Sequence, residues 1–295
     1  MYRKLDEYMA YLARNKSPNT IRNYEPQINK FMKWADDRSA LVEPFEHDQD
    51  FYLDYIDYLK CCYESAKTIH THMTSVYGFI NFLHRKGYIS KMPFIDSKEM
   101  NEFLPVITKK RVRTLSQSQL KNMLFVVEGD LMRESIIRLF YDTGFRVSEL
   151  VNLKISDIEV DFDRIIVNTK GKGKGGMTKH RTVRITKKTY DVIQELINSR
   201  NFTSEYILVS NKTKKPFTTR RIDQIVKEVA VSIGIENITT HMFRKSIATH
   251  LLENGMPIEY VSKYLGHASI STTIQNYTDL DRSIHDKFDE FHTSL

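Results

Sequence analysis

Apolar residues in the first hundred positions recur every three or four residues, which is the spacing of a helix with one buried face. Ser17 and Pro18 predict a helix start, because serine is a preferred N-cap and proline suits the first helical position. A later helix shows steps of four, three, four and three between its apolar residues, and Gly87 predicts its end. These apolar faces comprise Ile21, Tyr24, Ile28 and Phe31, then Ile69, Met73, Val76, Ile80 and Leu83.

The pattern changes in the second part of the chain. Residues 116–119 (SQSQ) form a capping box before another helical pattern. Short runs rich in β-branched residues at 164–168 and 182–185 predict two strands, joined by a basic, glycine-rich turn at 170–176. A further short strand is predicted at 206–209, and helical patterns run from about residue 220 to the end. The expected fold is mainly α-helical with a small β-sheet.

Length and composition narrow the architecture. At about 150 residues per domain, 295 residues suggest two domains. We predict a helical domain at 1–92, a linker at 93–114 that contains Pro93 and Pro105, and a mixed domain at 115–295. No apolar run approaches the roughly 18 residues of a membrane span, and the N-terminus lacks the apolar stretch of a signal peptide. The two cysteines, Cys61 and Cys62, are adjacent, which suits a reducing, cytoplasmic compartment and cannot complete a four-ligand zinc site.

Positive charge is unevenly distributed. The chain has 44 basic and 37 acidic residues, a net charge of +7. Residues 1–110 hold 16 basic and 15 acidic residues, so the remainder holds 28 and 22. The densest stretch, 164–188, contains nine lysines or arginines and no acid. This asymmetry indicates a boundary between two domains, and the excess of positive charge favours a polyanionic partner.

Two of four separated polar segments lie in the middle of the chain. Gly144 permits a left-handed turn after an apolar helix, and Arg146 and Glu149 then share one face of a new helix start, where anions are attracted. A local surface ion pair would explain the same residues. Lys170 and Lys172 end the first predicted strand, where a lysine could deliver a proton or simply be solvated.

The other two segments lie near the C-terminus. His241 and Arg244 share a helix face, with Thr240 as a possible cap. Gly266 ends the next helix, so that His267 projects from the break, and Tyr277 follows ten residues later. A hydrogen-bonded structural histidine and a packed tyrosine are ordinary explanations for these residues when each is taken alone.

Together the four segments resemble the tyrosine recombinase family of phage integrases and Xer-type enzymes. The similar segments are 143–150 (TGFRVSEL), 241–244 (HMFR), 248–251 (ATHL) and 265–267 (LGH), with Tyr277 and the start at 17–20 (SPNT). These segments occur in the order and with the separations that are typical of the family, and the resemblance spans nearly the whole chain. The resemblance implies an N-terminal helical, SAM-like core-binding domain and a mixed α/β catalytic domain, which form a C-shaped clamp on DNA. Lys245 stands where many relatives have histidine, and the hairpin is unusually rich in glycine.

The resemblance also implies a mechanism with a 3′-phosphotyrosyl intermediate. Arginines suit the neutralisation of the non-bridging phosphate oxygens, and a tyrosine nucleophile needs a base. No cofactor is expected, because the phosphotyrosine conserves the bond energy, and no metal is expected, because the arginines neutralise the phosphate charge. The implied roles are charge neutralisation for Arg146 and Arg244, a hydrogen bond to phosphate for His267, nucleophile for Tyr277, base for His241, acid for Lys170 with Lys172 as the alternative, and support for Glu149.

The implied partner is duplex DNA with inverted-repeat core sites, bound by a homotetramer. Predicted DNA contacts are Lys67, His70, Lys109, Lys110, Arg111, Arg113, Lys174, Lys179 and Arg181. Lys67 and His70 share with His72 a helix face that would otherwise be a solvated surface. The apolar tail residues Leu280, Ile284, Phe288 and Phe291 predict a helix that docks on a neighbouring protomer or on its own domain.

Several functions use the same residues. Integration, excision or resolution of a mobile element would each fit, with or without accessory DNA-bending proteins, and the target sequence stays open. A type IB topoisomerase-like nicking-closing enzyme and a non-catalytic DNA-binding protein on the same fold are the alternatives.

Overall fold

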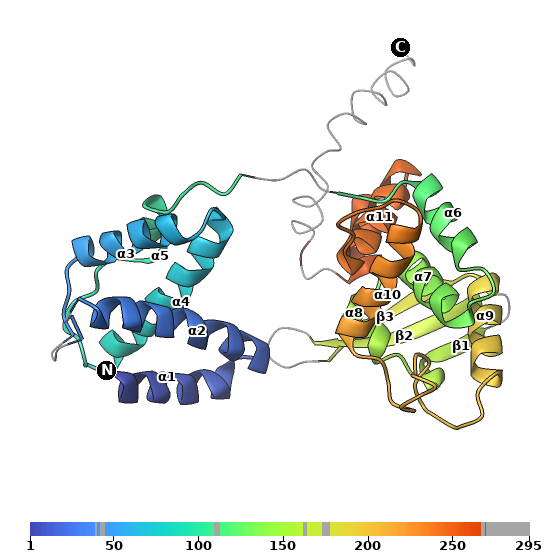
Figure 1. The fold of residues 1–295 in the computed structure, drawn as a ribbon, viewed down its shortest axis with the longest axis horizontal. Helices are drawn as coiled ribbons and strands as arrows, with labels where there is room; N and C mark the ends of the chain where they lie inside the picture. Colours follow the sequence, from blue (N-terminus) through green and yellow to red (C-terminus); the bar gives the residue numbers. More distant parts are fainter. Residues whose placement is uncertain are drawn as a thin grey trace, which may run out of the picture. The chain divides into compact units, whose positions relative to one another are not determined.

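The computed structural model describes residues 1–38, 40–41, 45–108, 113–161, 164–172 and 178–266, together with Ser269. Side chains are described at all of these except residues 161, 164, 169–172 and 178–180. The chain divides into two compact units, Met1–Lys110 and Arg111–Leu295 (Figure 1). No helix in the described ranges is both long and apolar enough to cross a membrane.

The first unit is helical, as predicted. The Ser17 side chain accepts a hydrogen bond of 3.2 Å from the main-chain N–H of Thr20, which confirms the predicted cap. The apolar positions of the later helix are all buried, which confirms its predicted face. The helices of this unit are α1 (Tyr2–Asn15), α2 (Pro18–Asp36), α3 (Gln49–Cys62), α4 (Ala66–Arg85) and α5 (Ser97–Glu102).

Aromatic rings dominate the core of the first unit. Phe31 is fully buried and lies within ring-contact distance of Trp34, Phe45, Phe51, Tyr52 and Tyr55. His72 is also buried, so the prediction that it lies on a solvated face was wrong. Its ring stacks at an angle on Tyr63, with the ring centres 5.0 Å apart, because α4 is wrapped on more sides than its apolar period indicated.

The segment predicted as a linker at 93–114 contributes to this core. It contains α5, and its apolar residues Phe94, Met100 and Leu104 are buried with the helices of the first unit. His70 in α4 donates a hydrogen bond from Nε2 to the Pro105 carbonyl oxygen, over 3.0 Å. The first unit therefore extends along the chain to Lys110.

The second unit combines a small sheet with helices. Its capping box at Ser116 and Gln119 is present as predicted. The helical elements are α6 (Gln117–Val126), α7 (Leu131–Thr143), α8 (Val147–Val151), the 3-10 turn η1 (Ile155–Asp157), α9 (Lys187–Asn198), α10 (Thr219–Ser232), α11 (Thr240–Glu253) and α12 (Ile258–Leu265).

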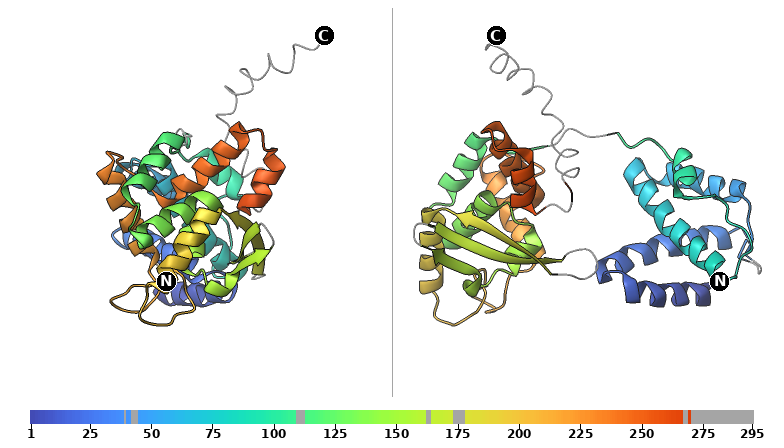
Figure 2. Two further views of the ribbon diagram at one scale, coloured as in Figure 1. Left: turned by 90° about the vertical axis from the view of Figure 1, so that its right-hand side faces the viewer. Right: turned by 180° about the vertical axis from the view of Figure 1, so that it is seen from behind.

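The sheet is antiparallel, with strand order β1-β2-β3, and Figure 2 shows the three strands side by side. The strands are β1 (Ile158–Asp161), β2 (Arg164–Lys172) and β3 (Thr178–Ile185). Both predicted strands are confirmed, and their pairing extends further into the basic turn than expected. The sequence did not predict β1. The prediction of a strand at 206–209 was wrong. Within it, Tyr206 makes an isolated bridge to Lys154, and Val209 makes another to Pro216.

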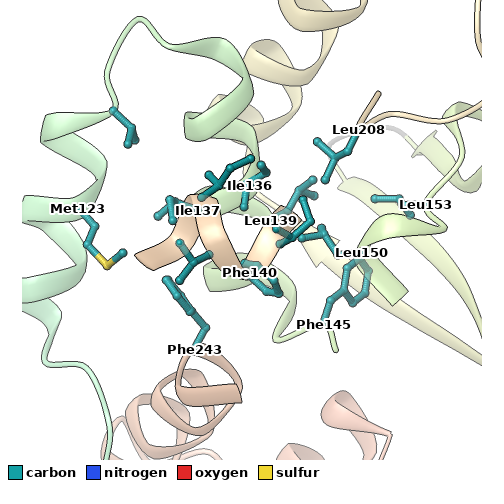
Figure 3. Packing of buried hydrophobic residues seen from close by; sticks show 14 of the residues in the cluster. Met123, Ile136, Ile137, Leu139, Phe140, Phe145, Leu150, Leu153, Leu208 and Phe243 are labelled. Atoms are coloured by element: carbon teal, nitrogen blue, oxygen red, sulfur yellow. The ribbon is translucent and has the colours of Figure 1, made fainter. Parts of the chain in front are cut away.

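Side chains of helix α7 lie among the buried hydrophobic residues of the second unit (Figure 3). Its residues Ile136, Ile137, Leu139 and Phe140 are fully buried, and the Phe140 ring stacks on Phe243 of α11 with the ring centres 5.3 Å apart. This packing brings the C-terminal end of α7 close to the N-terminal part of α11. The segment that carries Arg146 follows α7, and the segment that carries His241 and Arg244 begins α11. Packing in the hydrophobic core therefore brings these two segments together.

Candidate active site

The site is built around a tight turn at Gly144. Gly144 ends α7 with φ of 59°, in the left-handed region that favours glycine. A Cβ atom at this position would lie 2.8 Å from Leu265 Cδ2 and 2.9 Å from Ile247 Cγ2. Only glycine therefore satisfies both the backbone conformation and the close approach of α11 and α12.

Arg244 of α11 joins three segments of the site. It is only 2% exposed. Its Nη1 atom donates a hydrogen bond of 2.8 Å to the Gly144 carbonyl oxygen, and its Nη2 atom donates to the Leu265 carbonyl oxygen. A buried guanidinium is stable only with such partners. These contacts hold the Arg244 charge beside the turn that leads to Arg146.

Glu149 is shared by two arginines. Arg146 precedes α8, and its Nη1 atom lies 3.0 Å from Glu149 Oε1, while its main-chain N–H donates to Oε2 over 2.8 Å. Arg181 Nη2, from β3, lies 3.2 Å from the same Oε2 atom. Arg146 is 45% exposed and Glu149 only 9% exposed. Since α8 has only five residues, anion attraction here rests on the Arg146 charge more than on a helix dipole.

The C-terminal end of α12 is held against the same turn. Gly266 ends α12 with φ of 66°, as predicted from the sequence. The Tyr264 hydroxyl donates a hydrogen bond to the Asp142 carbonyl oxygen. Burial, together with the nearby Asp142 charge, raises the pKa of Tyr264 to about 12, so this hydroxyl stays protonated and remains a donor. Leu265, one residue before Gly266, is thereby fixed at the site.

His241 opens α11 at the surface, one turn before Arg244. Partial removal from water lowers its pKa, and the positive charges of Arg244, Lys245 and Arg146 lower the pKa further. Its imidazole is therefore neutral at neutral pH and can accept a proton. The predicted cap at Thr240 was wrong, because the Thr240 hydroxyl donates to Asp223 Oδ1 over 3.0 Å and Thr239 precedes the helix.

Comparison with family models decides the classification. Residues 113–283 match the model of the phage integrase family, and residues 5–87 match the model of the phage integrase N-terminal SAM-like domain. The chain belongs to the phage integrase family. It is a tyrosine recombinase, and its resemblance to that family in the arginine-containing segments is confirmed.

Named relatives of this recombinase share nearly its whole length. Tyrosine recombinase XerA of Pyrococcus furiosus is 32% identical over 278 residues, which cover 93% of this chain and 88% of the relative. The XerA protein of Thermococcus kodakarensis is 31% identical, with 93% and 89% covered. Tyrosine recombinase XerD of Listeria innocua is 28% identical over 303 residues, which cover 98% of this chain and 98% of the relative.

Solved structures show the same fold. The XerH site-specific recombinase bound to palindromic difH substrate gives a TM-score of 0.74 at 18% identity, over 93% of this chain and 80% of that one. The Tn1549 transposon integrase in complex with transposon right end DNA also gives 0.74 at 18% identity, covering 96% and 98%. The mainly helical fold with a small sheet and an N-terminal SAM-like domain is thus shared with known recombinases.

The structure brings together Arg146, Glu149, His241 and Arg244. Lys170 and Lys172 lie at the end of β2, where they pair in register with His180 and Thr178, so the strand runs past the predicted residue 168 to Lys172. Lys67 and Arg113 are exposed at the surface, and Lys179 lies in β3. Outside the described residues are Lys109, Lys110, Arg111, Lys174, His267, Tyr277 and the predicted tail helix with Leu280, Ile284, Phe288 and Phe291. In the part of the chain that is described, no cluster of three His, Cys, Asp or Glu residues could hold a metal ion.

Sequence reasoning missed two contributors, Asp142 and Tyr264, and did not foresee where Arg181 lies. The Asp142 carboxylate accepts hydrogen bonds from the Thr186 N–H, the Thr186 hydroxyl and the Thr189 hydroxyl, which joins α7 to α9. Arg181 precedes buried Val183 and Ile185 by two and four residues along β3, and this period of two was a usable signal that Arg181 faces inward. No comparable sequence signal marks Tyr264.

Proposed function

We propose that this tyrosine recombinase cleaves and rejoins duplex DNA through a 3′-phosphotyrosyl intermediate formed at the cluster of Arg146, His241 and Arg244. The observation that supports this most directly is the position of Arg244, a buried cation held by two main-chain carbonyl oxygens next to the Arg146 segment. Such a charge is set in place before substrate binds and needs no reorganisation during the reaction.

The two arginines address the main difficulty of the reaction. A phosphodiester carries negative charge that repels nucleophiles, and further charge builds on its non-bridging oxygens in the transition state. Guanidinium groups stay charged and donate two parallel hydrogen bonds to such oxygens. Glu149 balances part of the positive charge and orients Arg146 through two hydrogen bonds. We assign His267 a further hydrogen bond to the phosphate.

The covalent step then conserves the phosphate bond. The Tyr277 hydroxyl oxygen attacks phosphorus, and its proton passes to His241, whose lowered pKa leaves it neutral and ready to accept. The bond from phosphorus to the 5′ oxygen breaks, and that oxygen takes a proton from Lys170 or Lys172. A 5′ hydroxyl of a partner strand reverses these steps on the 3′-phosphotyrosine and restores the backbone without an external energy source.

The DNA partner is inferred from charge and from the relatives. XerH was solved on a palindromic substrate, and a lambda integrase dimer was solved on a core site. By analogy, we propose that the two domains of this chain clamp inverted half-sites and that four copies assemble for strand exchange. Movement of a mobile element is the proposed use, since one structural neighbour is a transposon integrase. Proposed phosphate contacts are Lys67, His70, Lys109, Lys110, Arg111, Arg113, Lys174 and Lys179.

The test is covalent capture on a defined duplex. An inverted-repeat site is first selected from a randomised duplex library with the full chain, and a nicked suicide substrate is built from it. We expect a protein–DNA adduct with wild type that disappears in Tyr277→Phe. Tyr260→Phe is the matched control, because Tyr260 is an exposed tyrosine on α12, and the adduct should persist.

The same substrate separates the alternatives. Absence of an adduct with wild type would overturn the enzymatic proposal and favour a DNA-binding protein. An adduct accompanied by relaxation of supercoiled DNA, but without exchange between two marked sites, would instead indicate a nicking-closing enzyme. Exchange between the marked sites supports recombination.

A further inference from the structure

Arg181 occupies an interior position that a DNA-contacting arginine would not take. It lies on β3 with a side-chain exposure of 8%, on the inward face shared with Val183 and Ile185. The guanidinium is packed 5.1 Å from the centre of the Phe145 ring, in a cation–π arrangement. A side chain buried in this way has little surface to offer a phosphate.

Each arm of the Arg181 guanidinium reaches a different part of the site. Nη2 lies 3.2 Å from Glu149 Oε2, which belongs to the Arg146 segment. Nη1 donates a hydrogen bond of 2.6 Å to the Leu265 carbonyl oxygen at the end of α12. The planar fork of arginine can make both contacts at once, whereas a lysine ammonium on a single stem cannot reproduce that geometry.

The Leu265 carbonyl oxygen is shared with Arg244. It accepts from Arg181 Nη1 and from Arg244 Nη2, and a carbonyl oxygen has two lone pairs for two donors. Close approach is possible because the next residue is Gly266, where a Cβ atom would lie 3.0 Å from Arg181 Cδ. One peptide group thus sets the positions of two guanidiniums.

We propose that Arg181 is a positioning residue that couples Arg146 to Arg244 through Glu149 and the Leu265 carbonyl, and this rests on the proposed function of these two arginines. Arg181 shares the negative charge of Glu149 with Arg146, so Glu149 offsets only part of the Arg146 charge that would face the scissile phosphate. Arg181 also holds the end of α12, where the Leu265 carbonyl oxygen accepts a hydrogen bond from Arg244. His267 follows two residues later in the sequence. Arg181 itself touches neither the substrate nor the reacting atoms.

Arg181→Gln separates this role from a phosphate contact. We expect single-turnover cleavage of the selected suicide duplex to slow by about 10- to 100-fold, since a displacement near 1 Å costs rates of this size. DNA affinity and its dependence on salt should match wild type. Arg184→Gln is the control: it removes the same charge from an exposed position on the same strand and should cleave at the wild-type rate.

A second substrate separates positioning from a general structural effect. A neutral methylphosphonate at the scissile linkage removes one negative charge and lowers the demand for correctly placed arginines. The rate deficit of Arg181→Gln should therefore narrow on this linkage. An equal loss of cleavage rate on the phosphate and the methylphosphonate linkage would overturn the proposal. A loss of DNA affinity, with the slope of affinity against salt concentration reduced by about one phosphate contact, would also overturn it.

Arg181→Lys carries the test if the glutamine variant fails to fold, because it keeps the positive charge. The lysine ammonium can reach Glu149 or the Leu265 carbonyl oxygen, but it lacks the two arms that let the guanidinium contact both. We therefore expect a cleavage rate between those of wild type and Arg181→Gln. Full wild-type activity in this variant would overturn the coupling. Absence of an adduct in wild type would refute the proposed function, whereas a wild-type adduct with an unimpaired Arg181→Gln refutes only this inference.

Discussion

The two units of the recombinase bury different kinds of side chain. Among the described residues, the first unit buries His72 and Ser75 but no charged side chain, and the rest of its interior consists of aliphatic and aromatic residues, tyrosines included. The second unit buries charged groups as well, Glu134 and Arg244, beside several buried hydroxyl groups. The first interior favours stability, whereas the second keeps charge in a defined place.

Burying charge is costly, and the second unit offsets the cost with fixed partners. Glu134 pairs with Arg138 over 2.7 Å, and Arg244 donates to two main-chain carbonyl oxygens. A charge held in this way contributes little net stability. It contributes preorganisation, which is the property that stabilises a highly charged transition state.

The largest effect that follows from this difference concerns Arg244. Arg244→Gln should slow covalent cleavage by about 100- to 1000-fold, as loss of one preorganised donor does in other enzymes. DNA affinity should change much less, because the exposed contacts remain. Adduct formation and DNA binding are measured on the selected duplex, with circular dichroism to verify folding. Equal losses of affinity and rate would break the contrast between the two units.

The converse change is Phe31→Ala in the first unit. Removal of this fully buried ring should lower the free energy of unfolding of that unit by about 3–5 kcal/mol. Trp34 is the chain's single tryptophan and contacts Phe31, so its fluorescence follows this unit during urea unfolding. Exposed Phe125 in the second unit provides the control, Phe125→Ala. An unchanged Trp34 transition would contradict the prediction.

Two helix-ending glycines sharpen the comparison. Gly87 follows α4 with φ of 71°, and a Cβ atom there would have no neighbour within 4 Å, whereas one at Gly144 would be crowded by Leu265 and Ile247. Gly87→Ala should cost about 1 kcal/mol, from the left-handed backbone alone. Gly144→Ala should cost about 1–3 kcal/mol more, because its methyl group would overpack against α11 and α12. Thermal unfolding followed by circular dichroism measures the loss of stability in both variants. Equal losses would show that α12 moves away from the turn at little cost.

The smallest change concerns pH. A general base must be neutral, so activity should fall as protons bind to His241. Because the pKa of His241 is lowered below the ordinary value of 6.5, the midpoint of the fall in cleavage rate should lie below that pH, and the fall should follow the protonation of one group. His241→Gln should remove this acid limb, whereas His84→Gln, at an exposed position of α4, should keep it. An acid limb centred above 6.5 would refute the role.

Local features were predictable because they depend on neighbouring residues. The Ser17 cap, the Ser116 capping box and the apolar face of α4 follow from caps and periods within one element. The two left-handed turns at Gly144 and Gly266 were visible for the same reason. Predictions failed where packing from several sides decided the outcome, as for the buried ring of His72 and for residues 206–209.

By itself, the sequence determined the helical character of the first unit, the β2–β3 hairpin and the order of the segments that carry Arg146, His241 and Arg244. Only the tertiary structure decided which residues meet. Gly144 and Arg244 are 100 residues apart in the chain, and Arg181 and Leu265 are 84 apart. Such contacts arise because α7 packs on α11 and β3 lies beside α12, and no local propensity encodes them. Arg181 therefore looked like one more surface cation in a basic hairpin, and became an interior residue only through the fold.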